Sequence, residues 1–412
     1  MRLLFGSIAI LSALSGVASA ACTQSNLTNG NQPNNGSVYV LYMPETSCWN
    51  GDLVVFAHGY VAPQQTTLAV PQDQLTINGV SLPGTLNQLG YAFAASSFSK
   101  NGLAIVQGVQ DTQDLVQNIL DPALHPHHIY LIGASEGGLV ATLSAEQLPQ
   151  VYSTAGAACG PIGSFQGQIN YFGDFRVVFD YFFPKQIPGN AINIPDEVIA
   201  DWDNGPNSYV NKIRAALAAN PKAAAQLIKV MNAAVTSDPA TVAETVLGAL
   251  WYNVFGTADA VATLGGQPYD NHNRIYLGSS NDLLLNLRVE RYTGSPAALA
   301  AVAGHYETSG FLKMPIVTLH TTGDPIIPYW HEPLYTLKTL ADGTLLQRIN
   351  LPVSAYGHCA FSSGDVLAAF ALMVLRETGL SVTSQIESVL PEGHRAAFGA
   401  ALKRSQEAIS IQ

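Results

Sequence analysis

The amino-acid sequence predicts an α/β protein, built on an open, mostly parallel sheet that is flanked by helices and carries one large helical insertion. Two observations lead to this fold class. Short, wholly apolar runs alternate with helix-like segments, which is typical of parallel strands that are covered on both faces. The alternation stops between residues 163 and 313, where helical segments follow one another without a strong strand signal.

Composition excludes two broad classes of protein. The chain of 412 residues has a net charge of −11 and only 11% charged residues. A nucleic-acid binder needs clustered Lys and Arg to meet phosphates, so we expect no nucleic-acid partner. The 48% of hydrophobic residues can fill a substantial core, which argues against a disordered chain.

The first 20 residues are typical of a secretory signal peptide. Arg2 supplies a positive charge, residues 3–14 are apolar, and residues 18–20 (Ala-Ser-Ala) fit a cleavage site. The apolar run is shorter than the roughly 20 residues that span a bilayer, so we expect no stable membrane insertion. Acylation of Cys22 is an alternative, but Ser19 stands where a lipoprotein site usually has an aliphatic residue. The sequence therefore predicts secretion to an extracellular or periplasmic space.

The four cysteines are expected to form two disulfides. An even number of cysteines fits an oxidising compartment, and none has the spacing of a zinc site, so we expect no metal. Three pairings are possible. We favour Cys22 with Cys48, which would tie down an N-terminal arm rich in Asn and Gly, and Cys159 with Cys359.

The expected strands are short, apolar runs separated by helical segments such as 109–120 and 139–148. They span residues 38–42, 53–57, 91–95, 129–132, 155–158, 315–319 and 346–351. Residues 21–162 and 314–412 are therefore assigned to one sheet domain. In such sheets, ligands bind at the carboxyl ends of the strands.

Residues 163–313 are expected to form a helical cap, because a block of this length is too long for a loop inside a compact domain. Asn220-Pro221 and Asp238-Pro239 each place a capping residue before a proline at the start of a helix. The entry to the cap is aromatic, which fits either packing against the sheet domain or the wall of a substrate site. The aromatic residues are Phe165, Tyr171, Phe172, Phe175, Phe179, Tyr181, Phe182 and Phe183.

The segment Gly133-Ala134-Ser135-Glu136-Gly137 matches the G-x-S-x-G pattern of a nucleophile elbow. The pattern alone is weak, but here it follows an expected strand and precedes an expected helix, as an elbow requires. The glycines are needed because the turn is tight and neighbouring backbones approach closely. Ser135 is the expected nucleophile; the alternative is a structural serine in a turn.

A serine hydroxyl needs a base that takes its proton, and the base needs an acid that fixes its tautomer. His358 is the best placed of the 10 histidines, in a short loop between the last expected strand and a helix. Asp324 follows the strand at 315–319, at the carboxyl edge of the sheet. Asp342 and Asp365 are rivals, but neither ends a strand.

The order of Ser135, Asp324 and His358 along the chain resembles that of the α/β-hydrolase superfamily. The motifs Ala57-His58-Gly59-Tyr60 and Gly323-Asp324-Pro325 add to the resemblance, which covers roughly residues 37–160 and 314–380. It implies an α/β-hydrolase fold and no cofactor. It also implies an oxyanion hole made by the backbone N–H groups of Tyr60 and Glu136, with His58 structural.

Cys359 directly follows His358, which is similar to the His-Cys pair of tannases and feruloyl esterases. Those enzymes also have a cysteine directly before the nucleophile, where this sequence has Ala134.

The motifs together predict a secreted serine esterase, a carboxylic ester hydrolase that acts through an acyl-enzyme on a small-molecule or polymeric ester. The aromatic cap favours substrates with apolar or aromatic groups. One alternative is a secreted serine peptidase of the prolyl-oligopeptidase type, in which cap carboxylates would bind the substrate amine. These carboxylates are Asp196, Glu197, Asp201 and Asp203. A catalytically silent binding protein on the same fold is a second alternative.

Overall fold

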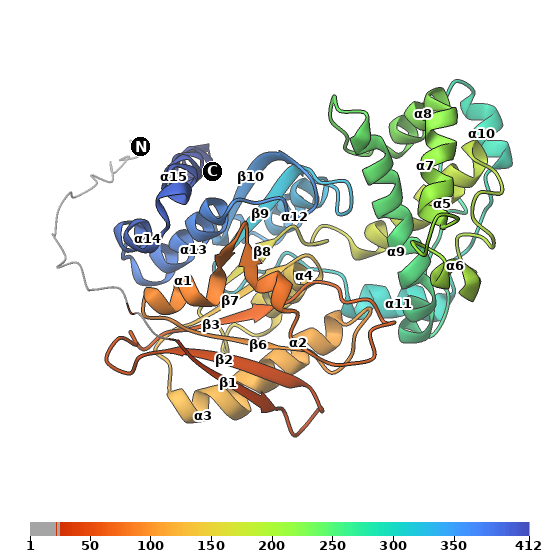
Figure 1. Cartoon of the computed structure of the whole chain (residues 1–412). Helices are drawn as coiled ribbons and strands as arrows, with labels where there is room; N and C mark the ends of the chain where they lie inside the picture. Colours follow the sequence, from red (N-terminus) through yellow and green to blue (C-terminus); the bar gives the residue numbers. More distant parts are fainter. Residues whose placement is uncertain (1–21, 23–24, 412) are drawn as a thin grey trace, which may run out of the picture.

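The structure is a computed structural model that describes residue 22 and residues 25–411, so the predicted signal peptide lies outside the described residues. Its centre is an eight-stranded sheet with the order β1-β2-β6-β3-β7-β8-β9-β10 (Figure 1). A separate two-stranded ribbon is formed by β4 and β5. The strands are β1 (Ser25–Asn31), β2 (Val38–Pro44), β3 (Leu53–Ala57), β4 (Thr76–Ile77), β5 (Val80–Ser81), β6 (Ala92–Ser96), β7 (Ile129–Ala134), β8 (Thr154–Ala158), β9 (Ile316–Gly323) and β10 (Arg348–Tyr356).

The main sheet is parallel except for β2, which runs antiparallel to both of its neighbours, β1 and β6. Every residue of β3 and β6 is buried, which explains why these strands are apolar without alternation. Along β3, Leu53 and Val55 belong to the core on one face, whereas Val54 and Phe56 belong to the core on the other. The sheet is therefore covered on both faces.

Helices pack on each face and form an inserted block between β8 and β9. They are α1 (Leu82–Gln88), α2 (Ile105–Asp114), α3 (Asp121–Leu124), α4 (Glu136–Gln147), α5 (Phe165–Phe182), α6 (Asp196–Ala200), α7 (Tyr209–Ala219), α8 (Pro221–Met231), α9 (Ala240–Leu264), α10 (Asp282–Arg288), α11 (Pro296–His305), α12 (His331–Ala341), α13 (Ser363–Thr378), α14 (Thr383–Val389) and α15 (Glu392–Ile411). Short 3₁₀ turns occur at η1 (Gln72–Leu75) and η3 (Leu345–Gln347), and a π-helix, η2 (Leu115–Leu120), continues α2.

The two faces of the sheet have different helices. Side chains of α2 and α4 share a core with one face, and side chains of α1, α13 and α15 share a core with the other. Since α4 follows β7 directly and α13 follows the loop after β10, the residues between these elements lie at the carboxyl end of the parallel strands. This edge of the sheet is where the candidate site forms.

The helices α5 to α11 lie to one side of the sheet, in yellow-green to turquoise in Figure 1. Strands β8 and β9 are direct neighbours, with Ala155 opposite Ile316, although this whole block separates them in sequence. Most of the block shares a hydrophobic core of its own. Asn220 caps α8 as predicted, by accepting from the N–H of Ala223. Asp238 accepts from the N–H of Ala240, the first residue of α9.

The N-terminal arm contains a strand that the sequence did not predict. Residues of β1 pair with β2 along their whole length, from Ser25 opposite Pro44 to Asn31 opposite Val38. The side chains of β1 are mostly exposed and polar, so backbone pairing rather than an apolar pattern forms this edge strand.

Both predicted disulfides, Cys22–Cys48 and Cys159–Cys359, are present. Among the described residues, no helix combines the length and the apolar composition that a membrane crossing requires.

Candidate active site

Ser135 lies in the sharp turn between β7 and α4. Its backbone has φ 57° and ψ −121°, outside the regions that non-glycine residues usually occupy. A Cβ on Gly133 would lie 2.0 Å from the carbonyl oxygen of Gly137, and one on Gly137 would lie 2.0 Å from that of Ala57. Only glycine fits at these two positions, which is why the turn can present Ser135 at the edge of the sheet.

A continuous chain of hydrogen bonds joins three residues that are far apart in sequence. Ser135 Oγ lies 2.8 Å from His358 Nε2, and His358 Nδ1 lies 2.7 Å from Asp324 Oδ2. An ionised carboxylate can only accept, so Nδ1 carries a proton and donates it to Asp324. Nε2 is then left to accept from the hydroxyl of Ser135. The side chain of His358 is 19% exposed, so the site is open to a ligand.

Asp324 directly follows the last residue of β9 and is buried. Its Oδ1 accepts from the backbone N–H groups of Ile326 at 2.8 Å and Ile327 at 2.9 Å. Burial by itself would raise the pKa of Asp324, but the neighbouring His358 and His320 outweigh burial and hold that pKa well below its usual value. The carboxylate therefore stays ionised.

The loop that carries His358 is tied to the adjacent strands. The N–H of Gly357 donates to the carbonyl of Gly323, at 3.1 Å, and Thr321 Oγ1 donates to the carbonyl of Gly357, at 2.7 Å. The next residue after the histidine, Cys359, is bonded to Cys159, just past the end of β8. These contacts fix the position of the imidazole.

The three residues follow particular strands of the main sheet. Ser135 follows β7, the fifth of the eight strands in chain order, Asp324 follows β9, the seventh, and His358 follows β10, the eighth. The second strand, β2, is the antiparallel one. The chain has the α/β-hydrolase fold. The fold class predicted from the sequence is thereby confirmed.

In this α/β-hydrolase fold, the loop after β3 packs against the turn that holds Ser135. A Cβ on Gly59 would lie 3.2 Å from Ser135 Cβ, and the N–H of Gly59 donates to Gln74 Oε1 at 2.6 Å. Tyr60 and Glu136 line the same cavity as Ser135. The N–H of Glu136 belongs to the first turn of α4, where N–H groups have no acceptor within the helix. These two N–H groups remain our proposed oxyanion hole.

His58 and Glu136 are buried next to the site, and both are held by backbone groups. His58 stacks on Phe98 with ring centroids 3.9 Å apart, and burial lowers its pKa, so the ring is neutral. Glu136 Oε1 accepts from the N–H of Ala104 at 2.8 Å. Burial raises the pKa of Glu136 to about 8, and the nearby Asp259 carboxylate adds to this effect.

Two cavities meet at Ser135. The smaller, of about 140 Å³, lies beneath helices α5 and α9 of the inserted block and is mostly apolar. Its lining includes Phe165, Ile169, Phe172, Tyr252, Ile326 and Ile327. The larger, of about 740 Å³, is also lined by His358 and extends between the sheet and α13. Phe165 also packs in the core that the block shares with the sheet, as one of the two interpretations expected, whereas Phe175 and Phe179 pack in the core of the block itself.

The other acidic candidates are not part of this hydrogen-bond chain. Asp342 is exposed at the end of α12, and Asp365 caps α13, where it accepts from the N–H of Ser362 and pairs with Arg404. None of the four acidic residues predicted to serve a peptidase is among those that line the two cavities next to Ser135.

Within the described part of the chain, Cys159, His358 and Cys359 are the group close enough together to hold a metal ion. The sulfur atoms of both cysteines are bonded to each other in the disulfide, so neither is a free thiolate ligand.

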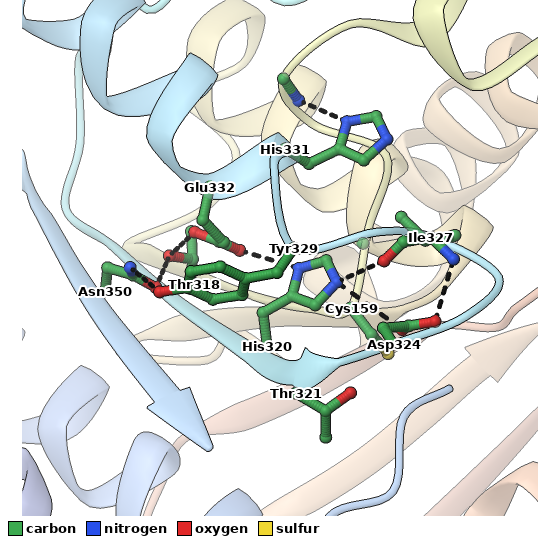
Figure 2. A network of polar contacts seen from close by, with 12 residues as sticks. Cys159, Thr318, His320, Thr321, Asp324, Ile327, Tyr329, His331, Glu332 and Asn350 are labelled. Atoms are coloured by element: carbon green, nitrogen blue, oxygen red, sulfur yellow. Dashed lines mark hydrogen bonds and ion pairs between the residues drawn. The ribbon is translucent and has the colours of Figure 1, made fainter. Parts of the chain in front are cut away.

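Sequence reasoning missed a buried polar network behind Asp324. His320 on β9 contacts Glu332 on α12 (Figure 2). Glu332 is also paired with Arg348 on β10. The signal in the sequence was a histidine directly after the apolar run at 315–319 and an arginine within the expected strand at 346–351.

No protein-family model matches the sequence, and no curated protein matches it. Similar solved structures include the acylaminoacyl peptidase of Pyrococcus horikoshii, at 10% identity over 81% of this chain and with a TM-score of 0.39. The chain spans 37% of the length of that peptidase. Lipase A of Candida antarctica is 14% identical, with 92% of this chain and 84% of the lipase covered and a TM-score of 0.43. Feruloyl esterase B of Aspergillus oryzae is 14% identical, with 86% and 80% covered and a TM-score of 0.43. Likenesses at this level say nothing about the reaction.

Proposed function

We propose that the chain is a serine hydrolase that cleaves carboxylic esters. Ser135 is the nucleophile. His358 is the general base and then the general acid, and the ionised carboxylate of Asp324 orients the histidine. The observation that carries this proposal is the hydrogen-bond chain from Asp324 through His358 to Ser135, at the mouth of an apolar cavity.

The reaction uses only side chains and backbone groups of the chain. Ser135 Oγ bonds to the ester carbonyl carbon while its proton moves to His358 Nε2. The N–H groups of Tyr60 and Glu136 donate to the oxyanion. The bond to the alcohol oxygen then breaks, and Nε2 returns the proton to that oxygen. A water molecule, deprotonated by His358, attacks the acyl-enzyme, and the carboxylic acid leaves as Oγ regains a proton.

The smaller cavity indicates the size of one substrate group. An engineered apolar cavity of roughly 150 Å³ holds a benzene ring, so the cavity of about 140 Å³ has room for a single aromatic ring or a short acyl chain. We infer that the acyl group binds there and that residues 163–313 act as a cap. In this proposal, Phe172 and Tyr252 of the cap form a stacked pair, 4.8 Å between ring centroids, against the acyl group.

Secretion is part of the proposal. Two disulfides are typical of proteins from oxidising compartments, and the sequence predicts a signal peptide at residues 1–20. An extracellular or periplasmic esterase would meet small-molecule or polymeric esters taken from its surroundings.

The first experiment measures initial rates of hydrolysis of p-nitrophenyl esters from acetate to palmitate, with Ser135→Ala as the control. We expect hydrolysis that is fastest for short acyl groups and lost in the variant. A fluorophosphonate should label the wild-type chain and not the variant. Absence of both hydrolysis and labelling would overturn the proposal. Labelling with cleavage of an aminoacyl-p-nitroanilide, but of no ester, would replace it with the peptidase alternative.

A further inference from the structure

Asp324 has a second histidine neighbour, His320, which the mechanism above does not use. His320 lies on β9 and is fully buried. Its Nε2 is 2.8 Å from the carbonyl oxygen of Ile327 and 3.6 Å from Asp324 Oδ2. Its Nδ1 is 3.1 Å from Glu332 Oε1. Figure 2 shows the ring between these three partners.

Both ring nitrogens of His320 face oxygens that can only accept. A backbone carbonyl has no proton to donate, and Glu332 is ionised because it is paired with the guanidinium of Arg348. A neutral imidazole has one N–H, so it would place a lone pair against one of these oxygens in a buried site. Only the doubly protonated ring satisfies both contacts.

The charges behind Asp324 alternate in sign. Arg348 pairs with Glu332, Glu332 contacts His320, and His320 contacts Asp324. Burial by itself would lower the pKa of His320, but its contacts with Asp324 and Glu332 outweigh burial and raise that pKa to about 10. Arg348 likewise outweighs burial and holds the pKa of Glu332 below its usual value.

Further titratable side chains next to this network are neutral at neutral pH. The ring of Tyr329 meets His320 edge-on, with centroids 5.8 Å apart. Burial and the charge of His320 hold the pKa of His331 well below its usual value. Around Asp324, burial raises the pKa values of three tyrosine hydroxyls above the usual value: Tyr171, Tyr252 and Tyr356.

We propose that His320 is a positioning residue that stays protonated and keeps Asp324 ionised. Its charge also weakens the electrostatic attraction between Asp324 and the protonated ring of His358. Ser135 can then be activated at a lower pH than Asp324 alone would allow. This inference rests on the proposed function. His320 also fixes the turn, because Ile327 accepts from His320 through its carbonyl and donates to Asp324 through its N–H.

The physical reason is the charge that His358 acquires when it takes the proton of Ser135. A lone buried carboxylate would stabilise that charge strongly and would keep His358 protonated, and thus unable to act as a base, up to a higher pH. A fixed positive charge on the other partner of the carboxylate offsets this attraction. The triad then works with the neutral histidine over a wider pH range.

The first test observes the ring of His320 directly, in wild-type protein without added histidines. Long-range ¹H–¹⁵N spectra are recorded from pH 5 to pH 8. We expect one imidazole whose two nitrogens both remain protonated throughout, unlike the buried and neutral His331. A neutral pattern for every histidine at pH 8 would overturn the inference. This measurement requires no variant to fold.

The second test measures the pH profile of kcat/KM with a neutral ester for wild type, His320→Gln and His331→Gln. The matched control, His331→Gln, also removes a buried histidine, one that contacts Gly163 and Gln168 rather than Asp324. We expect His320→Gln to move the acid limb upward by roughly one pH unit, as for loss of one nearby charge. We expect the control to leave that limb in place.

The outcomes separate this inference from the proposed function. An acid limb that is unchanged in His320→Gln, with only a lower kcat, would make His320 merely structural and overturn the inference. Absence of ester hydrolysis by wild type would overturn the proposed function, whereas the NMR spectra would still report the protonation of His320.

Discussion

The two oxygens of Asp324 have different partners, and this makes the residue sensitive to a single-atom change. In Asp324→Asn, the amide oxygen can keep the N–H groups of Ile326 and Ile327, which places the amide NH₂ against His358 Nδ1. The proton of the ring must then move to Nε2, which can no longer accept from Ser135. We expect kcat for ester hydrolysis to fall roughly 10³- to 10⁴-fold, with KM little changed.

The control for this variant is Asp342→Asn, which changes an exposed acid of the same chain segment. It should leave kcat and KM within twofold of wild type. Equal losses in the two variants would contradict the assigned role of Asp324.

Because the carboxyl group of Glu136 is buried, we expect the free energy of unfolding to depend on pH. Its pKa is raised by burial from 4.5 to about 8, so between these values the folded state binds more protons than the unfolded state. Stability from this group is therefore full below about pH 4.5 and is lost as the pH rises through about 8. Glu136→Gln keeps an acceptor for the N–H of Ala104 and cannot ionise. We expect it to be more stable than wild type at pH 9, by on the order of 5 kcal/mol, and similar at pH 5.

Urea unfolding at the two pH values measures this difference. A stability gap that is the same at pH 5 and pH 9 would mean that the carboxyl of Glu136 does not titrate in this range.

At the residue scale, the sequence predicted what local motifs encode. Ser135, Asp324 and His358 each lie in a turn directly after a strand, and such a turn can be recognised without knowing its neighbours. His320, Glu332 and Arg348 could not be grouped in this way. Their contact depends on the pairing of β9 with β10 and on the packing of α12, which only the folded chain defines.

At the scale of elements, the loop of His358 depends on the Cys159–Cys359 bond, which closes a segment with a sequence separation of 200 residues. Replacing both cysteines by serine should lower kcat, because the imidazole loses its tether, and should lower Tm, because the unfolded chain gains freedom. The loss of stability should be roughly 2–5 kcal/mol. If kcat and Tm were both unchanged, the proposed role of this disulfide in holding the His358 loop would be wrong.

The matched control for that variant replaces Cys22 and Cys48 by serine. This pair fastens the edge of the sheet near β1 and β2 and has no contact with His358. It should reduce Tm and leave kcat unchanged.

We expect Phe172 of α5 to limit the length of the acyl group that the enzyme accepts. Its ring stacks on Tyr252 and lines the cavity of about 140 Å³. In Phe172→Ala the cavity becomes larger, so the chain-length optimum for p-nitrophenyl esters should move to longer acyl groups by roughly two to four carbons. Phe182→Ala, on the same helix but outside the lining of both cavities next to Ser135, should leave the optimum where it is. A shift of the same size in both variants would exclude the proposed acyl pocket.

Several elements differ from their predicted bounds for identifiable reasons. The expected helix at 109–120 begins at Ile105 and changes to a π-helix at Leu115, because apolar periodicity does not report the change in helical pitch. The expected strand at 346–351 begins at Arg348 and runs to Tyr356, since its pairing with β9 continues beyond the apolar run. Boundaries set by long-range backbone pairing carry little local signal.

At the scale of the whole molecule, the net charge of −11 should repel anionic substrates. Salt screens such repulsion over roughly 10 Å at 0.1 M. We expect kcat/KM for the p-nitrophenyl monoester of succinic acid to rise about two- to fivefold between 10 and 300 mM NaCl. The value for p-nitrophenyl butyrate, which is neutral, should stay constant; an equal rise for both esters would point to a salt effect on the fold.

The α/β class and the position of the inserted block could be predicted, because the alternation of strands and helices and its interruption can be recognised from the order of residues alone. The order of strands in the sheet could not, because β6 lies between β2 and β3 and β8 lies beside β9 only in the folded chain. The resemblance in motifs supplied the fold name that alternation alone left open.

The two disulfides impose an order on oxidative folding. Cys48 follows Cys22 by 26 positions, so this pair can close while most of the chain is still being made. Cys159 pairs with a residue 200 positions later, and in the oxidising compartment that we propose it would be an unpaired thiol until that residue is made. Any bond it forms with Cys22 or Cys48 in that interval must be exchanged before Ser135 can meet His358. A host without an efficient disulfide isomerase would therefore accumulate full-length, soluble, but inactive mispaired chains.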